Sequence, residues 1–267
     1  MIFKVLVSGL RRKFIVLRAV GRVSFREIVR DKILYNSLLC ALLLLGVAFL
    51  ASKLTYVRPE RVVLDFGLSS VSLASAIIAI LIGAPLLIRE FERRTIFVAL
   101  AKPISRFDFL LGKFTGLLMV LTANWAILSA VFLVILYSVG GTASVTLSWG
   151  LVLALLQSWL VAAITVFFST FSTTSLSVMI SLGVFAVGSS ISQVQFLATK
   201  VESTIGRAVL QGLARVFPDF EHFQLGSKVI YELPVSLRFG VSAVLYSLFL
   251  GGFFLLLSGY LIQRREI

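Results

Sequence analysis

The stretch from residue 89 to residue 116, REFERRTIFVALAKPISRFDFLLGKFTG, is a charged island between two runs that contain no Asp, Glu, Lys or Arg. These uncharged runs are Phe66–Ile88 before the island and Phe114–Thr199 after it. About 20 apolar residues in a helix cross the hydrocarbon core of a bilayer. Each run is therefore long enough to span a membrane, and the island is predicted to join two spans.

The rest of the chain continues this pattern. Ile33–Ser52 and Phe239–Gln263 also lack charged residues, and the mean hydropathy of the 267-residue chain is +1.04. Turn signals at Gly140-Gly141-Thr142 and Ser172-Thr173-Thr174 divide the longest run into three. The sequence predicts an all-α polytopic membrane protein with one transmembrane domain over residues 1–267. Its six spans are expected at about 33–54, 67–88, 114–138, 147–170, 174–197 and 239–262.

The distribution of basic residues predicts the orientation. Six spans place both termini on the same side as the loop at 89–113. That side carries nine Lys or Arg before Ile33, six in the loop and two after the last span, whereas eight lie on the other side. By the positive-inside rule the first group is cytoplasmic. Membrane topology thus accounts for the net charge of +13, and no nucleic-acid partner is expected.

The segments outside the spans carry their own signals. Residues 1–32 are predicted to form a cytoplasmic amphipathic region, because basic residues recur along an apolar stretch. Ser24-Phe25-Arg26-Glu27 matches a capping box and predicts a helix that begins at Ser24 and turns into the first span near Asn36. An ordinary juxtamembrane helix and an elbow that transmits motion both fit. Residues 198–238 are predicted as an outer-face segment that contains a helix lying flat on the interface.

The island itself reads as two helices with a break. Glu90 lies three and four residues before Arg93 and Arg94, which predicts local ion pairs on a continuing helix. Pro85 should kink the span before the island, and Pro103 should end its first helix. Ser105 is predicted to cap the next helix, in which Gly112-x-x-x-Gly116 forms a close-packing face. A solvated basic loop and a docking surface for another protein both fit this pattern.

Motifs for independent chemistry are missing from the sequence. There is no P-loop for ATP, no H-E-x-x-H and only one histidine, so we expect no catalytic residue, no metal site and no cofactor in this chain. Two predicted spans have small or hydroxylated faces, which suit either a solute pathway and dimer face or simple helix packing. These candidate positions are Ser72, Ala76, Gly83, Ser177, Ser181, Gly188 and Ser192.

Three segments of the island resemble the permeases of ABC-2 type transporters. They are Glu92–Ile96, Leu100–Arg106 and Phe109–Gly116, and Phe25–Asn36 and Phe217–Phe223 resemble the start of that family and its segment before the last span. The nearest branch is that of the NosY-like permeases associated with nitrous-oxide-reductase maturation. The resemblance covers most of residues 24–267.

The resemblance implies a type V exporter-like fold with an N-terminal connecting helix, in a bacterial inner membrane with both termini cytoplasmic. Two permease copies, expected as a homodimer in lipid, would work with two cytoplasmic ABC ATPase subunits that hold ATP and Mg. The connecting helix would use Ser24, Glu27 and Arg30. The ATPase-coupling residues would be Glu90, Glu92, Arg93, Arg94, Thr95, Lys102, Pro103, Ser105 and Arg106.

The chain is therefore expected to be the permease subunit of an exporter, not an enzyme. The alternative is a membrane anchor that couples an ATPase to a periplasmic accessory protein or membrane partner without moving a solute.

Overall fold

A computed structural model describes residues 17–55, 58–92, 105–201, 203–230 and 235–264. These residues form helices and short connections, with no strand among them. A first helix covers residues 17–29. The long helices are α2 (Lys32–Lys53), α3 (Pro59–Gly83), α6 (Arg106–Ser138), α7 (Val145–Ser169) and α12 (Leu237–Arg264). The shorter elements are α4 (Pro85–Glu92), α8 (Thr174–Gly188), α9 (Ile191–Lys200), α10 (Thr204–Val216), η1 (Glu221–Phe223) and α11 (Gly226–Ile230).

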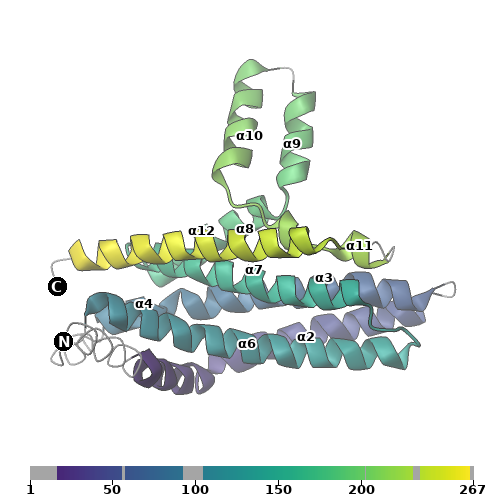
Figure 1. Cartoon of the computed structure of the whole chain (residues 1–267), viewed down its shortest axis with the longest axis horizontal. Helices are drawn as coiled ribbons and strands as arrows, with labels where there is room; N and C mark the ends of the chain where they lie inside the picture. Colours follow the sequence, from purple (N-terminus) through teal and green to yellow (C-terminus); the bar gives the residue numbers. More distant parts are fainter. Residues whose placement is uncertain (1–16, 56–57, 93–104, 202, 231–234, 265–267) are drawn as a thin grey trace, which may run out of the picture.

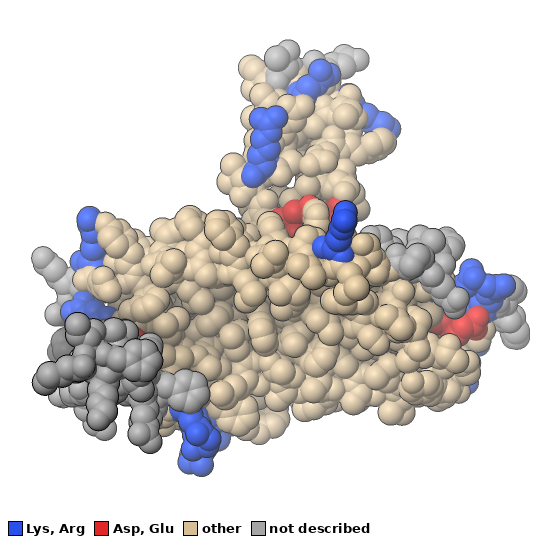
Figure 2. Space-filling view, viewed as in Figure 1, with Lys and Arg blue, Asp and Glu red and all other residues tan. Residues whose placement is uncertain are grey.

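The centre of the bundle is formed by α3 and α7. In the apolar stretches of both helices 72% of the residues are buried, against 22%, 33% and 17% in α2, α6 and α12. The less buried helices expose large apolar side chains such as Leu43 on α2 and Phe249 on α12. Figure 2 shows a broad side of the bundle almost without charge, with Lys and Arg at its two ends. Apolar surface of this extent suits contact with lipid tails.

The predicted spans are confirmed in number when a bent helix pair is counted as one. Five helices are long and apolar enough to cross a membrane, and the pair α8 and α9 makes up to six among the described residues. Helix α6 ends at Ser138, as expected from the Gly140-Gly141 turn, where Gly140 has a φ of 84°. The predicted break at Pro85 also occurs: α3 ends at Gly83 and α4 begins at Pro85, which has no backbone N–H to donate.

The predicted fifth span, at about 174–197, is bent, a feature that the sequence analysis did not anticipate. Between α8 and α9 the chain bends by 66° at Ser189 and Ser190. In a continuous helix the Ser192 N–H would donate to the Gly188 carbonyl. Instead, the Phe220 N–H donates to the Gly188 oxygen at 2.9 Å, and the Ser192 N–H donates to Glu221 Oε1 at 2.9 Å. The bend is therefore stabilised by groups about 30 residues further along the chain.

Beyond the bend, α9 and α10 form a hairpin. Figure 1 shows the two helices side by side, running across the long axis of the bundle. If the spans follow the membrane normal, this hairpin runs parallel to the membrane plane. Ile205, Val209 and Val216 are exposed along α10, as the apolar stripe in the sequence predicts. The position of the hairpin at the outer interface stays a prediction.

Figure 1 also shows that α4 and the end of α12 lie at one end of the bundle and α11 at the other. We call these the α4 end and the α11 end.

Candidate functional site

The first helix crosses α6 at very short range at the α4 end. A Cβ added to Gly112 would lie 2.6 Å from the Cβ of Val20, and one added to Gly116 would lie 2.6 Å from the Cβ of Ser24 and 2.7 Å from the Gly21 carbonyl oxygen. The predicted close-packing face is thus confirmed, and its partner is helix 17–29. Only glycine lets the two backbones approach this closely.

This crossing explains why the predicted capping box is wrong. Helix 17–29 is already regular before Ser24, so Ser24 lies in mid-helix and caps nothing. Its hydroxyl is buried against α6, with no hydrogen-bond partner among the described residues. The helix ends before Arg30, and Asp31 starts α2 as its N-cap by accepting the Ile33 N–H at 3.0 Å. Packing on Gly116 therefore overrides the local capping signal.

A buried lysine ties three helices together next to this crossing. Lys113, on α6 between the two packing glycines, has a side chain only 6% exposed. Its Nζ lies 2.8 Å from Glu27 Oε2 on the first helix and 2.5 Å from Glu90 Oε1 on α4. The Glu90 side chain is 14% exposed and that of Glu27 is 46% exposed. A buried ammonium needs such partners, because removing a lone charge from water costs several kcal/mol.

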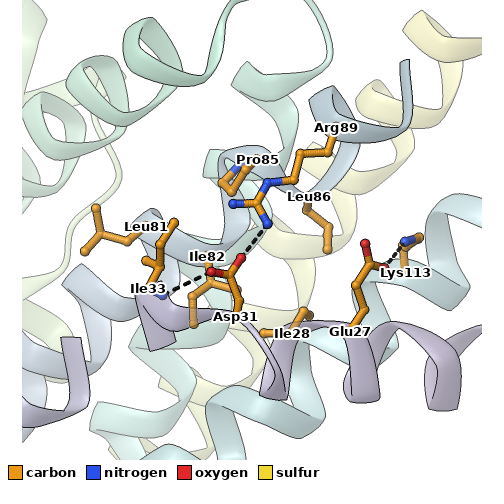
Figure 3. Close-up of a pocket in the computed structure, with 10 residues that line it drawn as sticks. All are labelled: Glu27, Ile28, Asp31, Ile33, Leu81, Ile82, Pro85, Leu86, Arg89 and Lys113. Atoms are coloured by element: carbon orange, nitrogen blue, oxygen red, sulfur yellow. Dashed lines mark hydrogen bonds and ion pairs between the residues drawn. The ribbon is translucent and has the colours of Figure 1, made fainter. Parts of the chain in front are cut away.

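A second ion pair joins α4 to the start of α2. The Arg89 guanidinium donates to Asp31 Oδ2, while Asp31 Oδ1 accepts the Ile33 N–H (Figure 3). Partial burial raises the pKa of the Asp31 carboxyl, but the Ile33 amide and the Arg89 guanidinium outweigh it. The net result is a pKa below the ordinary value of 3.8. At neutral pH this carboxylate is ionised and the pair is intact.

We refer to Glu27, Asp31, Arg89, Glu90 and Lys113 as the charge cluster. Figure 3 shows two of its three ion pairs, Arg89 with Asp31 and Lys113 with Glu27, near Pro85, the first residue of α4. The space beside Glu27, Asp31, Arg89 and Lys113 is about 30 Å³, enough for about one water molecule. The cluster therefore cannot hold a substrate. It connects the first helix, α2, α4 and α6 beside Pro85, and we call it the joint between these helices.

The structure places part of the predicted coupling set around this joint. Glu90 contributes to the cluster, Glu92 ends α4, and Ser105 caps α6 by accepting the Asp108 N–H at 3.0 Å, as predicted. Arg106 donates from Nη1 to the Ile262 carbonyl of α12 at 3.1 Å. Arg93, Arg94, Thr95, Lys102 and Pro103, and the predicted ion pairs of Glu90 with the two arginines, lie outside the described residues. The role of this set in coupling stays a prediction.

Most of the candidate pathway positions pack inside this chain. Ala76, Gly83, Ser177, Ser181 and Gly188 are buried. Gly83 lies against Thr165 of α7, and a Cβ on Gly188 would meet the Pro218 carbonyl oxygen at 2.3 Å. Ser192 is exposed and donates to Glu221. Ser72 is half-buried, donates to Gln157 Oε1 at 2.8 Å and lines a cavity at the α11 end. A dimer-face role for these residues stays a prediction.

Sequence reasoning missed three members of the charge cluster. Glu27 and Glu90 were among the candidate residues, but the sequence analysis assigned no role to Asp31, Arg89 or Lys113. The usable signal was the position of Lys113 between two close-packing glycines, because the residues beside such a crossing are covered by the partner helix.

A bundle of apolar spans, joined at one end by a buried charge cluster, defines an integral membrane protein of the polytopic helical class. Residues 19–205, well over half of the chain, match the family model described as ABC-2 family transporter protein. The chain belongs to this family. Members are transport permeases rather than ATPases themselves and generally work with ABC ATPase partners. A search of curated proteins finds no match for the chain.

The family match begins at residue 19, within the helix that packs on Gly112 and Gly116. It includes the whole charge cluster. The match does not distinguish the NosY-like branch from other members.

Proposed function

We propose that this chain is the permease subunit of an ATP-driven exporter, with a separate ATPase that docks on the α4 end. The observation that carries this proposal is the charge cluster, in which Lys113 joins Glu27 and Glu90 from two different segments. A force on α4 or on the following residues 93–104 would pass through these contacts into α6 and α2. The break at Pro85 separates this unit from the central span α3.

The basic residues support the orientation. Both ends of the described chain lie at the α4 end (Figure 1), and 17 of the 25 Lys and Arg belong to segments that the sequence analysis assigns to this side. We therefore place this end in the cytoplasm of a bacterium whose inner membrane holds the protein. Two ATPase subunits, which bind ATP and Mg, and a second permease copy complete the proposed complex.

Transport of a solute is favoured over a role as anchor for a periplasmic or membrane partner. The supporting observation is a cavity of about 380 Å³ at the α11 end, next to α3 and the end of α8. An anchor without a solute needs no such space beside its central spans.

The test is co-purification of the ATPase with the permease in which Arg93→Glu and Arg94→Glu are combined. We expect the ATPase to dissociate from the permease or its ATP hydrolysis to become uncoupled, because the substitutions change two positive side chains of the docking loop to negative ones. A matched control reverses Arg58 and Arg61, which lie at the α11 end of α3. Normal co-purification and normal stimulation in the first double variant would refute ATPase docking at this loop.

A further inference from the structure

The cavity at the α11 end has the size of a small-molecule site. It is bounded by α3, α7, the end of α8 and the segment from η1 to α11, and its volume is about 380 Å³. Ligand sites in proteins typically measure about 300–1,000 Å³. Apolar walls are supplied by Leu68, Phe185 and Phe223, and the polar lining includes Asp65, Ser69, Ser72, Ser189 and Gln224.

The charge of the lining is negative. Among the side chains that the structure describes, Asp65 is the one charged residue that lines this cavity. The Asp65 carboxylate makes no ion pair or hydrogen bond within the described parts of the chain. Arg61 lies one turn earlier on α3 and does not line the cavity. A ligand that enters therefore meets an exposed carboxylate for which the described residues supply no partner.

Two of the hydroxyls in the cavity already donate their hydrogen atoms to hydrogen bonds within the protein. Ser72 Oγ donates to Gln157 Oε1 at 2.8 Å, and Ser189 Oγ donates to the Phe185 carbonyl. A hydroxyl carries a single donor, so each of these oxygens can only accept a further bond. Together with Asp65 they make a surface that has many hydrogen-bond acceptors and few donors. An anion or a ligand made only of acceptors would find few donors there, chiefly the Ser69 hydroxyl and the Gln224 amide, and it would meet the negative charge of Asp65.

We propose that this cavity binds an amphiphilic primary amine. The ammonium group donates to Asp65, Ser72 and Ser189 accept further donors of the same ligand, and the apolar body lies against Phe185, Phe223 and Leu68. An ammonium has three donors and no acceptor, which matches this lining, and aromatic faces attract cations and apolar groups alike. As the substrate class of an exporter, this inference rests on the proposed function.

The test measures binding of dansylcadaverine, a primary amine on an aromatic body, to the full-length chain in phosphatidylcholine nanodiscs. Fluorescence titration is corrected with empty nanodiscs and repeated with the N-acetylated probe, which has nearly the same shape but no charge. We expect saturable binding of the amine and a loss of at least about tenfold in affinity for the acetylated probe, the size expected for a charged hydrogen bond. The probe comparison needs no variant and so does not depend on mutant folding.

Variants then locate the site. Asp65→Asn should weaken amine binding by about tenfold, whereas Glu60→Gln, on the first turn of the same helix and outside the cavity, should leave it unchanged. Absence of saturable binding, equal affinity for both probes, or equal losses in the two variants would each overturn the proposal. The titration contains no ATPase, so it is independent of the docking test. If the chain binds its ATPase but does not bind the amine, only this inference is refuted. If the chain binds the amine but the Arg93→Glu and Arg94→Glu variant still recruits and stimulates the ATPase normally, only the proposed function is refuted.

Discussion

Replacing Lys113 with methionine is the sharpest perturbation of the charge cluster. Methionine keeps an unbranched apolar stem but removes the ammonium that lies 2.8 Å from Glu27 and 2.5 Å from Glu90. Breaking a fully buried ion pair costs about 3–5 kcal/mol. Glu27 is nearly half exposed, so its share is at most about 1 kcal/mol. Glu90 is mostly buried and is left without this counter-charge, which brings the expected loss for Lys113→Met to about 3 kcal/mol.

The assay is reversible unfolding of the full chain in mixed micelles by titration with SDS. Adding Glu90→Gln to Lys113→Met should restore about 2 kcal/mol, because the buried carboxylate is neutralised. Lys32→Met is the matched control: Lys32 is exposed at the same end of the bundle, and its loss should change the free energy of unfolding by no more than about 0.5 kcal/mol. If Lys113→Met and Lys32→Met were equally stable, or if Glu90→Gln gave no recovery, the ion pairs of Lys113 with Glu27 and Glu90 would be refuted.

Three further predictions concern neighbouring contacts. Gly116→Ala should destabilise the packing of helix 17–29 by about 1–3 kcal/mol, because the alanine Cβ would lie 2.7 Å from the Gly21 carbonyl oxygen. The rate of proteolysis at the first helix measures this change. The same rate in the variant and the wild type would contradict the prediction. The pair of Asp31 and Arg89 should contribute stability above the ordinary pKa of 3.8 and lose it as the pH falls further, because the folded-state pKa of Asp31 is the lower one. A difference between wild type and Asp31→Asn that does not shrink as the pH falls below 3.8 would speak against it. Gly188→Ala should lower the free energy of unfolding by about 1–3 kcal/mol, because the alanine Cβ would clash with the Pro218 carbonyl oxygen. Thermal unfolding measures this loss. A variant as stable as the wild type would exclude this contact.

Features that depend on neighbouring residues could be predicted from the sequence. The cap at Ser105 depends only on the backbone amide of Asp108, three residues further on. The break at Pro85 depends only on the backbone N–H that this proline lacks. The lengths of the apolar runs gave the spans in the same way, because the thickness of the bilayer sets a minimum length for a helix.

The capping box at Ser24 shows the limit of this reasoning. Ser24 and Glu27 have the correct spacing for a cap, yet the first belongs to the middle of a helix and the second binds Lys113. A local signal worth about 1 kcal/mol is overridden when a helix can pack against a glycine face. That face lies almost 90 residues away along the chain, so no local pattern reveals the choice.

The charge cluster and the bend in the fifth span were missed for the same reason. The sequence places Glu90 next to Arg93 and Arg94, but its contact with Lys113 joins α4 to α6, two helices whose closeness no local pattern reveals. The bend at Ser189 likewise depends on Phe220 and Glu221, which replace a helical hydrogen bond. Charged and small residues could be identified from the sequence, but not the partners that tertiary packing brings to them.

The most direct test of the proposed coupling is ATP hydrolysis by the partner ATPase assembled with the permease in nanodiscs. Lys113 lies at the joint and outside residues 93–104, so Lys113→Met should still co-purify with the ATPase while permease-dependent stimulation of ATP turnover falls severalfold. Lys32→Met should behave as wild type. Full stimulation with Lys113→Met, at a temperature where that variant is folded, would contradict the claim that the charge cluster transmits the force of the ATPase into the membrane spans.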